Sequence, residues 1–203
     1  MIKRLLSAKI IKYAKQYPIV TVTGPRQSGK TTLCKMLFPN MRYFSLEDLD
    51  VREDARRDPR GFLGEIEKNG AILDEIQRLP ELLSYIQTLA DKDGRPGRFI
   101  LTGSQNFELL NSISQTLAGR TALATLLPFS FDEIYGTRNP GGIDKVLFAG
   151  FYPRIHDKKL NPTEALSFYV STYLERDIRA LIHVKELSKF ELFLKLCAAR
   201  TGQ

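Results

Sequence analysis

A glycine-rich stretch near the start of the chain carries the strongest chemical signal in the sequence. It reads GPRQSGKTT and fits the spacing G-x-x-x-x-G-K-[ST]. Glycines let successive backbone N–H groups turn inward, and a helix that starts at the end of such a loop directs its positive dipole end at the same point, where phosphates can bind. The expected phosphate contacts come from Gly24, Pro25, Arg26, Gln27, Ser28, Gly29, Lys30, Thr31 and Thr32.

Two side chains at the end of this loop complete the expected nucleotide site. Lys30 would reach the β- and γ-phosphates, and the hydroxyl of Thr31 would ligate Mg²⁺. The β-branched stretch 19–23 directly precedes the loop, as a strand–loop–helix arrangement requires. The role of Arg26 stays open between a phosphate contact and an exposed loop side chain.

A pair of carboxylates follows the short apolar stretch 71–73. A buried strand that ends in Asp74 and Glu75 beside a phosphate loop would supply the groups that ATP hydrolysis needs. Asp74 would hold Mg²⁺, and Glu75 would orient or deprotonate the attacking water. Acidic residues are common at strand ends, so it is the preceding phosphate loop that favours the catalytic interpretation.

Other polar residues are expected near the same site. The stretch LTGSQN at 101–106 leaves a strand at the edge where ligands of open α/β sheets bind. Ser104 would sense the γ-phosphate or position water there, with Thr102 and Gln105 as alternatives, although a helix N-cap is the plainer role for Ser104. Arg120 could stabilise phosphate charge in its own site or in a neighbour's, or it could cap a helix end.

These residues need a scaffold that brings several strand ends together. Strand-like apolar segments alternate with segments of helical periodicity up to residue 128, and this alternation predicts a parallel sheet with crossover helices. From residue 129 onward the pattern is helical only. The expected strands are 19–23, 41–45, 71–73, 99–101 and 121–127, and the longest expected helices are 2–17, 31–38, 82–90, 109–117, 161–181 and 188–198.

Local capping signals predict where four helices begin. Asp58 and Asn161 each precede a proline, which is typical of a cap followed by a first-turn proline. Ser45 and Ser188 each precede an acidic residue by three positions, which resembles a capping box.

The composition is that of an ordinary globular chain. It has 203 residues, of which 43% are apolar and 26% charged, and it has no apolar run of about 18 residues. We therefore expect a cytoplasmic protein without a membrane span or signal peptide. Cys34 and Cys197 lie in apolar helical patterns and are expected to be buried free thiols, and no zinc site is expected.

The net charge of +7 is concentrated at the start of the chain. Residues 1–40 contain eight Lys or Arg and no Asp or Glu. A polyanionic nucleotide accounts for part of this charge, and DNA binding is a second interpretation. For Lys3, Lys12 and Lys15 the favoured interpretation is a solvated helix face.

In combination, GPRQSGKTTL, YFSLED, ILDEIQRLPELL, FILTGSQN, LAGRTALATLLPFSFDEI and YLERDIRAL resemble prokaryotic AAA-family ATPases that carry a C-terminal domain of unknown function. The resemblance covers nearly the whole chain. It implies an AAA-type P-loop fold with a five-stranded parallel sheet of order 5-1-4-3-2, followed by a helical segment. It also implies ATP and Mg²⁺ binding by Lys30, Thr31 and Asp74, hydrolysis by Glu75, and an arginine finger at Arg120 that acts between subunits.

This resemblance shapes the expected organisation and function. An AAA-type nucleotide-binding domain would cover 1–128, including an amphipathic helix at 1–17, and a helical segment would cover 129–203. Relatives continue past the position of Gln203, so the chain is expected to be truncated. We expect a Mg-dependent ATPase that binds ATP or ADP and couples hydrolysis to a conformational change of a partner or neighbouring subunit, with a homo-oligomer formed through Arg120 and a protein partner at the last helix.

The alternative is an ATP-binding switch, or a module that binds nucleic acid or protein, with negligible hydrolysis. A small-molecule kinase is disfavoured because the adjacent carboxylates suit water activation, and a GTPase is disfavoured because no Asn-Lys-x-Asp motif is present.

Overall fold

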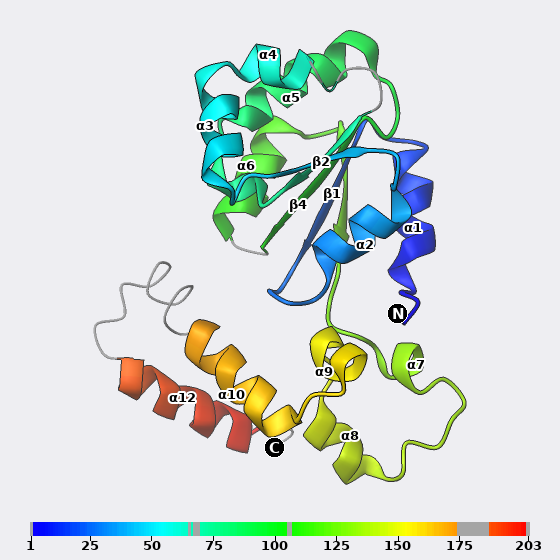
Figure 1. Ribbon diagram of the computed structural model, residues 1–203, viewed down its shortest axis with the longest axis vertical. Coiled ribbons are helices and arrows are strands. Elements are labelled where there is room, and N and C mark those ends of the chain that lie inside the picture. Colours follow the sequence, from blue (N-terminus) through cyan, green and yellow to red (C-terminus); the bar gives the residue numbers. More distant parts are fainter. Residues whose placement is uncertain (1, 65, 67–69, 105–106, 174–186, 202–203) are drawn as a thin grey trace. The chain divides into compact units, whose positions relative to one another are not determined.

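The computed structural model describes residues 2–64, 66, 70–104, 107–173 and 187–201, and its centre is a five-stranded parallel sheet (Figure 1). The strand order is β2-β3-β4-β1-β5, which is the predicted order 5-1-4-3-2 counted from the opposite edge. The strands are β1 (Ile19–Gly24), β2 (Arg42–Ser45), β3 (Ala71–Asp74), β4 (Phe99–Ser104) and β5 (Thr121–Thr125).

The strand register determines which residues meet at the carboxyl edge of the sheet. Gly24 at the end of β1 lies opposite Ser104 at the end of β4. Ser45 at the end of β2 lies opposite Asp74 at the end of β3. Because all neighbouring strands are parallel, the phosphate loop after β1 and the acidic pair at the end of β3 are brought to the same edge.

Helices cover both faces of the sheet (Figure 1). Alternate strand residues point to opposite faces, so Val20 packs with the helices of one face and Ile19 with those of the other. One face is covered by α1 (Leu6–Ala14) and α2 (Lys30–Leu37). The other is covered by α3 (Leu49–Arg57), α4 (Pro59–Gly64), the 3₁₀ helix η1 (Ile76–Arg78), α5 (Leu82–Asp93) and α6 (Phe107–Thr116).

The chain divides into two compact units, residues 1–139 with 151–153, and residues 140–150 with 154–203. The first unit holds the sheet and the short helix α7 (Phe131–Ile134). Helices form the second part of the chain as predicted, namely α8 (Ile143–Ala149), α9 (Pro153–Lys158), α10 (Pro162–Tyr173) and α12 (Leu187–Ala199). Of the predicted helix 161–181, residues 174–181 lie outside the described residues.

Two of the four predicted helix starts are confirmed. The carboxylate of Asp58 accepts a hydrogen bond from the backbone N–H of Gly61 at 2.9 Å, at the start of α4. The side-chain oxygen of Asn161 accepts one from the N–H of Thr163 at 2.9 Å, at the start of α10. In both cases a proline occupies the first helical position, as the sequence indicated.

The other two predicted starts are wrong. Ser45 belongs to β2, where it pairs with Asp74, and α3 begins after Asp48, whose side chain makes no capping bond. Strand pairing in the folded chain therefore overrides the local signal at Ser45. Helix α12 already includes Leu187, so Ser188 lies inside the helix instead of before it.

The two cysteines differ in exposure, which corrects the prediction for one of them. Cys34 on α2 is fully buried, and burial raises its thiol pKa to about 12. Cys197 on α12 is exposed. Helix α12 is apolar nearly all round, and Leu192 and Leu196 are also more than half exposed, so its sequence did not indicate which side would be covered.

No helix in the described ranges is long and apolar enough to cross a membrane.

Candidate functional site

Two glycines give the loop after β1 its shape. Gly29 has φ of 91° and directly precedes α2, so the chain turns through the left-handed region before the helix begins. Gly24 has φ of 150°, and a Cβ atom added there would lie 2.1 Å from the carbonyl oxygen of Leu126. Only glycine fits at that close approach, so the first glycine of the motif is required by packing as well as by the turn.

The side chain of Lys30 lies inside the loop. Its ammonium group donates hydrogen bonds to the carbonyl oxygens of Gly24, at 3.0 Å, and Pro25, at 2.9 Å. Burial lowers the pKa of Lys30, while the nearby charges of Glu75 and Asp74 act in the opposite direction. The positive charge of Arg26 adds to the lowering. The loop therefore holds a partly desolvated cation whose ammonium group donates to two neutral carbonyl oxygens.

The carboxylate of Asp74 is the centre of the polar contacts at the strand ends. Its two oxygens accept hydrogen bonds from the hydroxyl of Thr31, at 3.0 and 2.9 Å. The hydroxyl of Tyr43 donates to one of these oxygens at 2.8 Å, and the hydroxyl of Thr102 donates to the other. Three hydroxyl groups from α2, β2 and β4 thus converge on one buried carboxylate at the end of β3.

This donor set fits Mg²⁺. A hard cation prefers oxygen ligands, and the Thr31 hydroxyl and the Asp74 carboxylate supply them in direct contact with each other. Among the described residues no three His, Cys, Asp or Glu side chains gather into a metal cluster. Mg²⁺ beside phosphates needs no such cluster, because one or two protein oxygens, the phosphates and water complete its shell.

Tyr43 and Thr102 show what sequence reasoning missed at this carboxylate. The sequence suggested Thr102 as an alternative sensor, and the structure places its hydroxyl on Asp74. Nothing in the sequence marks Tyr43 as a site residue, since an aromatic residue in a strand is usually a packing residue. Burial and the hydrogen bond to Asp74 raise the pKa of Tyr43, and the ammonium of Lys35 lies 3.3 Å from its ring centroid. No local motif marks this contact.

The residue after Asp74 has a strained backbone. Glu75 adopts the left-handed conformation, with φ of 58° and ψ of 45°, which is uncommon for a residue with a side chain. The side-chain amide of Gln77 donates a hydrogen bond to the Glu75 carboxylate. Such strain is typical of functional sites, and it directs the chain sharply away from the strand end into η1.

The predicted sensor positions lie at the correct edge of the sheet. Ser104 is partly buried at the carboxyl end of β4, opposite Gly24. Gln105 lies outside the described residues. Ser104 is a neighbour of the loop because it lies opposite Gly24, and the sensor role of Ser104 stays a prediction.

Arg120 lies at the amino ends of the strands, whereas the phosphate loop lies at their carboxyl ends. This corrects the expected location. It directly precedes β5, whose first residue Thr121 pairs with Ile19, the first residue of β1. Six residues of β1 separate that end from the loop, a span of roughly 16–20 Å in a strand. The guanidinium pairs with Asp91 on α5, with one N–O distance of 2.9 Å. Arg120 therefore cannot serve the phosphate site of its own chain.

The remaining basic residues near the start of the chain divide into two groups. Lys3, Lys12 and Lys15 are exposed, as the interpretation of a solvated helix face predicted. Arg4 is buried, with 7% of its surface exposed, and the sequence gave no indication of this.

Comparison with known protein families identifies the fold. Residues 16–135 match the family described as an AAA domain, and residues 141–203 match a domain of unknown function. Two uncharacterized proteins, from Mycobacterium bovis and Mycobacterium tuberculosis, are each 30% identical over 182 residues. The match covers 88% of this chain and 40% of each relative, so the chain spans well under half their length.

Two solved structures of similar proteins were also found. AMPPCP-bound DnaA from Aquifex aeolicus has a TM-score of 0.53 and 16% identity, over 87% of this chain and 64% of that one. A Walker-type ATPase of Pyrococcus abyssi has a TM-score of 0.48 and 19% identity, over 66% of this chain and 56% of that one. The DnaA match supports a P-loop NTPase fold for the sheet and its flanking helices.

Proposed function

The chain belongs to the AAA domain family, and on this premise we propose that it binds Mg-ATP and hydrolyses the γ-phosphate. The observation that carries the proposal is the contact between Thr31 and Asp74, because it joins the phosphate loop to the acidic strand end in one oxygen-rich site. A loop that only turned the chain would not need this contact.

The loop would bind the triphosphate through three kinds of group. Backbone N–H groups between Gly24 and Thr32 and the N-terminal end of α2 attract anions. Lys30 would exchange its carbonyl partners for phosphate oxygens, which are charged and therefore stronger acceptors for a desolvated cation. Arg26 would add positive charge close to Lys30.

Hydrolysis would depend on groups at the start of α2 and at the carboxyl ends of β3 and β4. Thr31 and Asp74 would hold Mg²⁺, which neutralises charge that develops on the phosphates. Glu75 would orient the attacking water and accept its proton, after its side chain leaves Gln77. Ser104 would contact the γ-phosphate from the end of the neighbouring strand.

Further proposals concern the organisation of the protein. Residues 1–128 would form the nucleotide-binding domain, and the helical residues 129–203 would respond to it and contact a partner protein. Arg120 would act as an arginine finger for a neighbouring subunit, because its own site is out of reach. The DnaA of similar fold was solved with the nucleotide analogue AMPPCP bound, which supports nucleotide binding by this chain as well.

Substitution of Glu75 by Gln tests the catalytic proposal. The amide has nearly the same shape as the carboxylate but cannot accept the proton of water, so phosphate release should fall by about 100-fold or more while ATP binding persists. The measurement is release of inorganic phosphate from the purified chain with Mg-ATP, together with titration of a fluorescent ATP analogue. The matched control is Glu164→Gln, the same change at an exposed position on α10.

Two outcomes would overturn the proposal in different ways. Equal phosphate release by Glu75→Gln and wild type would remove Glu75 from catalysis. Tight ATP binding by a wild-type chain that releases no phosphate at any protein concentration would favour the alternative, an ATP-binding switch.

A further inference from the structure

Arg4 is a buried charged side chain with no role in the site described above. It precedes α1, only 7% of its surface is exposed, and its guanidinium stacks over the ring of Phe129 at 4.7 Å. A buried guanidinium is costly unless its donors are satisfied. Its partners therefore show what the side chain holds together.

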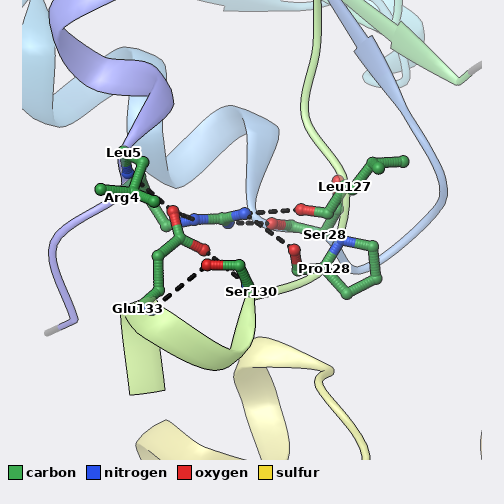
Figure 2. Close-up of polar contacts among 7 residues, drawn as sticks. All are labelled: Arg4, Leu5, Ser28, Leu127, Pro128, Ser130 and Glu133. Carbon is green, nitrogen blue, oxygen red and sulfur yellow. Dashed lines mark hydrogen bonds and ion pairs between the residues drawn. The ribbon is translucent and has the colours of Figure 1, made fainter. Parts of the chain in front are cut away.

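The guanidinium of Arg4 joins the phosphate loop to the segment that follows β5 (Figure 2). One terminal nitrogen donates to the carbonyl oxygen of Ser28 in the loop at 2.8 Å. The other donates to the carbonyl oxygens of Leu127 and Pro128. These acceptors are separated by about a hundred residues along the chain, so the arginine is a bridge between two distant backbone segments.

The bond to Ser28 fixes a peptide group of the phosphate loop. No peptide bond among the described residues is cis, so the N–H of Gly29 points in the direction opposite to the Ser28 carbonyl. Because that carbonyl points to Arg4, the Gly29 N–H is directed away from Arg4. Arg4 thus orients one of the backbone donors of the expected phosphate site without contacting a phosphate itself.

Glu133 anchors the other side of Arg4. Its carboxylate accepts a hydrogen bond from Nε of Arg4 at 3.2 Å and from the backbone N–H of Leu5 at 2.7 Å. It also forms a capping box with Ser130 at the start of α7, as Figure 2 shows. Helix α7 and the turn before α1 are consequently held by the same carboxylate that neutralises Arg4.

A second contact links the same two segments. The N–H of Leu126 donates to the carbonyl of Thr23 at 2.7 Å, and the Leu126 carbonyl leaves no space for a Cβ atom at Gly24. The segment 126–128 therefore contacts the start of the loop directly and its end through Arg4. Both ends of the loop are therefore linked to this segment.

We propose that Arg4 is a positioning residue that holds the phosphate loop to residues 127–135. Binding of a nucleoside triphosphate at the loop then alters the conformational freedom of that segment. The inference rests on the proposed nucleotide binding. In addition to nucleotide binding, we name Arg4 as the residue, and 127–135 as the segment, that respond to the bound nucleotide. In the sequence, this segment lies between β5 and residue 140, where the second unit begins.

Hydrogen exchange of the full chain, with and without Mg-AMPPCP, tests the proposal. In the wild type the analogue should slow exchange of amides in residues 2–6 and 127–135 together, by about fivefold or more. Arg4→Lys keeps the charge but loses the planar fork that reaches three carbonyls. At saturating analogue its 127–135 amides should show no such response, and its affinity should fall about tenfold.

The matched control is Lys3→Ala, an exposed cation beside Arg4, which should behave as wild type. A full exchange response in Arg4→Lys would overturn the inference. If Arg4→Lys does not fold, the wild type still tests the inference. Binding of the analogue by the wild type without slower hydrogen exchange in residues 127–135 would also overturn it. A wild type that binds no analogue would instead refute the proposed function, and this inference with it.

Discussion

Lys30 shows how the burial of a single cation lowers the stability of the folded chain. Burial lowers its pKa in the folded chain below the ordinary value of 10.5. The unfolded chain therefore binds the proton more tightly, and the folded state is destabilised at any pH below the folded pKa. This destabilisation is relieved as the pH rises through the folded pKa toward 10.5.

Substitution of Lys30 by Met should separate binding from stability. ATP at 100 times the dissociation constant stabilises a protein by about 2.7 kcal/mol, and the variant should lose this stabilisation because the charged partner of the phosphates is gone. Without nucleotide, the variant should lose little stability at pH 7, since it no longer buries a cation. Raising the pH toward 10 should favour the wild type relative to the variant.

Thermal unfolding with and without Mg-ATP, at two pH values, measures both effects. Lys12→Met on the exposed face of α1 is the control for removal of a lysine charge. An ATP-dependent rise in the unfolding temperature of Lys30→Met equal to that of wild type would contradict the placement of Lys30 at the phosphates.

At this scale the sequence predicted the residues of a contiguous motif and missed those that meet only in the fold. Lys30, Thr31 and Asp74 lie in motifs whose spacing has one physical explanation. Tyr43 and Arg4 reach the site from segments that are distant in the sequence, and nothing in their local sequence distinguishes them from a strand aromatic and a surface cation. Their positions follow from strand order and from the path of the chain after β5.

At the scale of elements, the strand–loop–helix unit depends on how closely the loop approaches the backbone after β5. Substitution of Gly24 by Ala would place a methyl group 2.1 Å from the Leu126 carbonyl oxygen, and the positive φ adds strain. We expect a loss of about 1–3 kcal/mol of unfolding free energy, together with weaker nucleotide binding, because the loop must move away from this carbonyl.

Urea unfolding of Gly24→Ala measures this loss directly. Gly64→Ala on α4 is the matched control, because no atom lies within 4 Å of its added Cβ, and alanine is the better helix former. Equal stability of the two variants would show that the approach of Leu126 does not constrain the loop.

The elements were predicted best where burial is continuous. Strands β1 and β3 are buried on both faces, so their apolar runs marked them clearly. The helix starts at Ser45 and Ser188 were predicted wrongly, because the same local pattern also occurs at a strand end and within a helix. Tertiary pairing decides between these outcomes, and a local pattern contains no information about it.

At the scale of the whole molecule, the role proposed for Arg120 would make the proposed catalytic site a property of an assembly. The arginine lies at the edge of the sheet away from the loop, and its partner Asp91 is an exposed residue of the same chain. Exposed ion pairs are weak, so a neighbouring subunit's phosphate could draw the guanidinium away at little cost. The expected parallel sheet already implied this placement, because a residue that precedes a strand lies at its amino end, away from the loop that follows β1.

Mixing two inactive variants tests this arrangement. Arg120→Ala lacks the finger and Glu75→Gln lacks the catalytic carboxylate, so each should hydrolyse ATP poorly by itself. In an equimolar mixture, about one site in four would combine an intact Glu75 with an intact Arg120 from a neighbour, and activity should recover to about a quarter of the wild-type rate.

Phosphate release from the mixture, compared with each variant alone at the same total concentration, gives the result. An Arg120→Ala chain that hydrolyses ATP at the wild-type rate would show that Arg120 is not a finger. A mixture of two assembled variants with no gain in activity would also contradict action between subunits.

The carbonyl partners of Lys30 have a consequence for ligand selectivity. Lys30 donates hydrogen bonds to the neutral carbonyl oxygens of Gly24 and Pro25, so a ligand that brings formal negative charge would be the stronger acceptor in their place. On the proposed function, such a loop would select ligands by the charge of their phosphates. Discrimination between adenine and guanine would then have to come from residues outside 24–32.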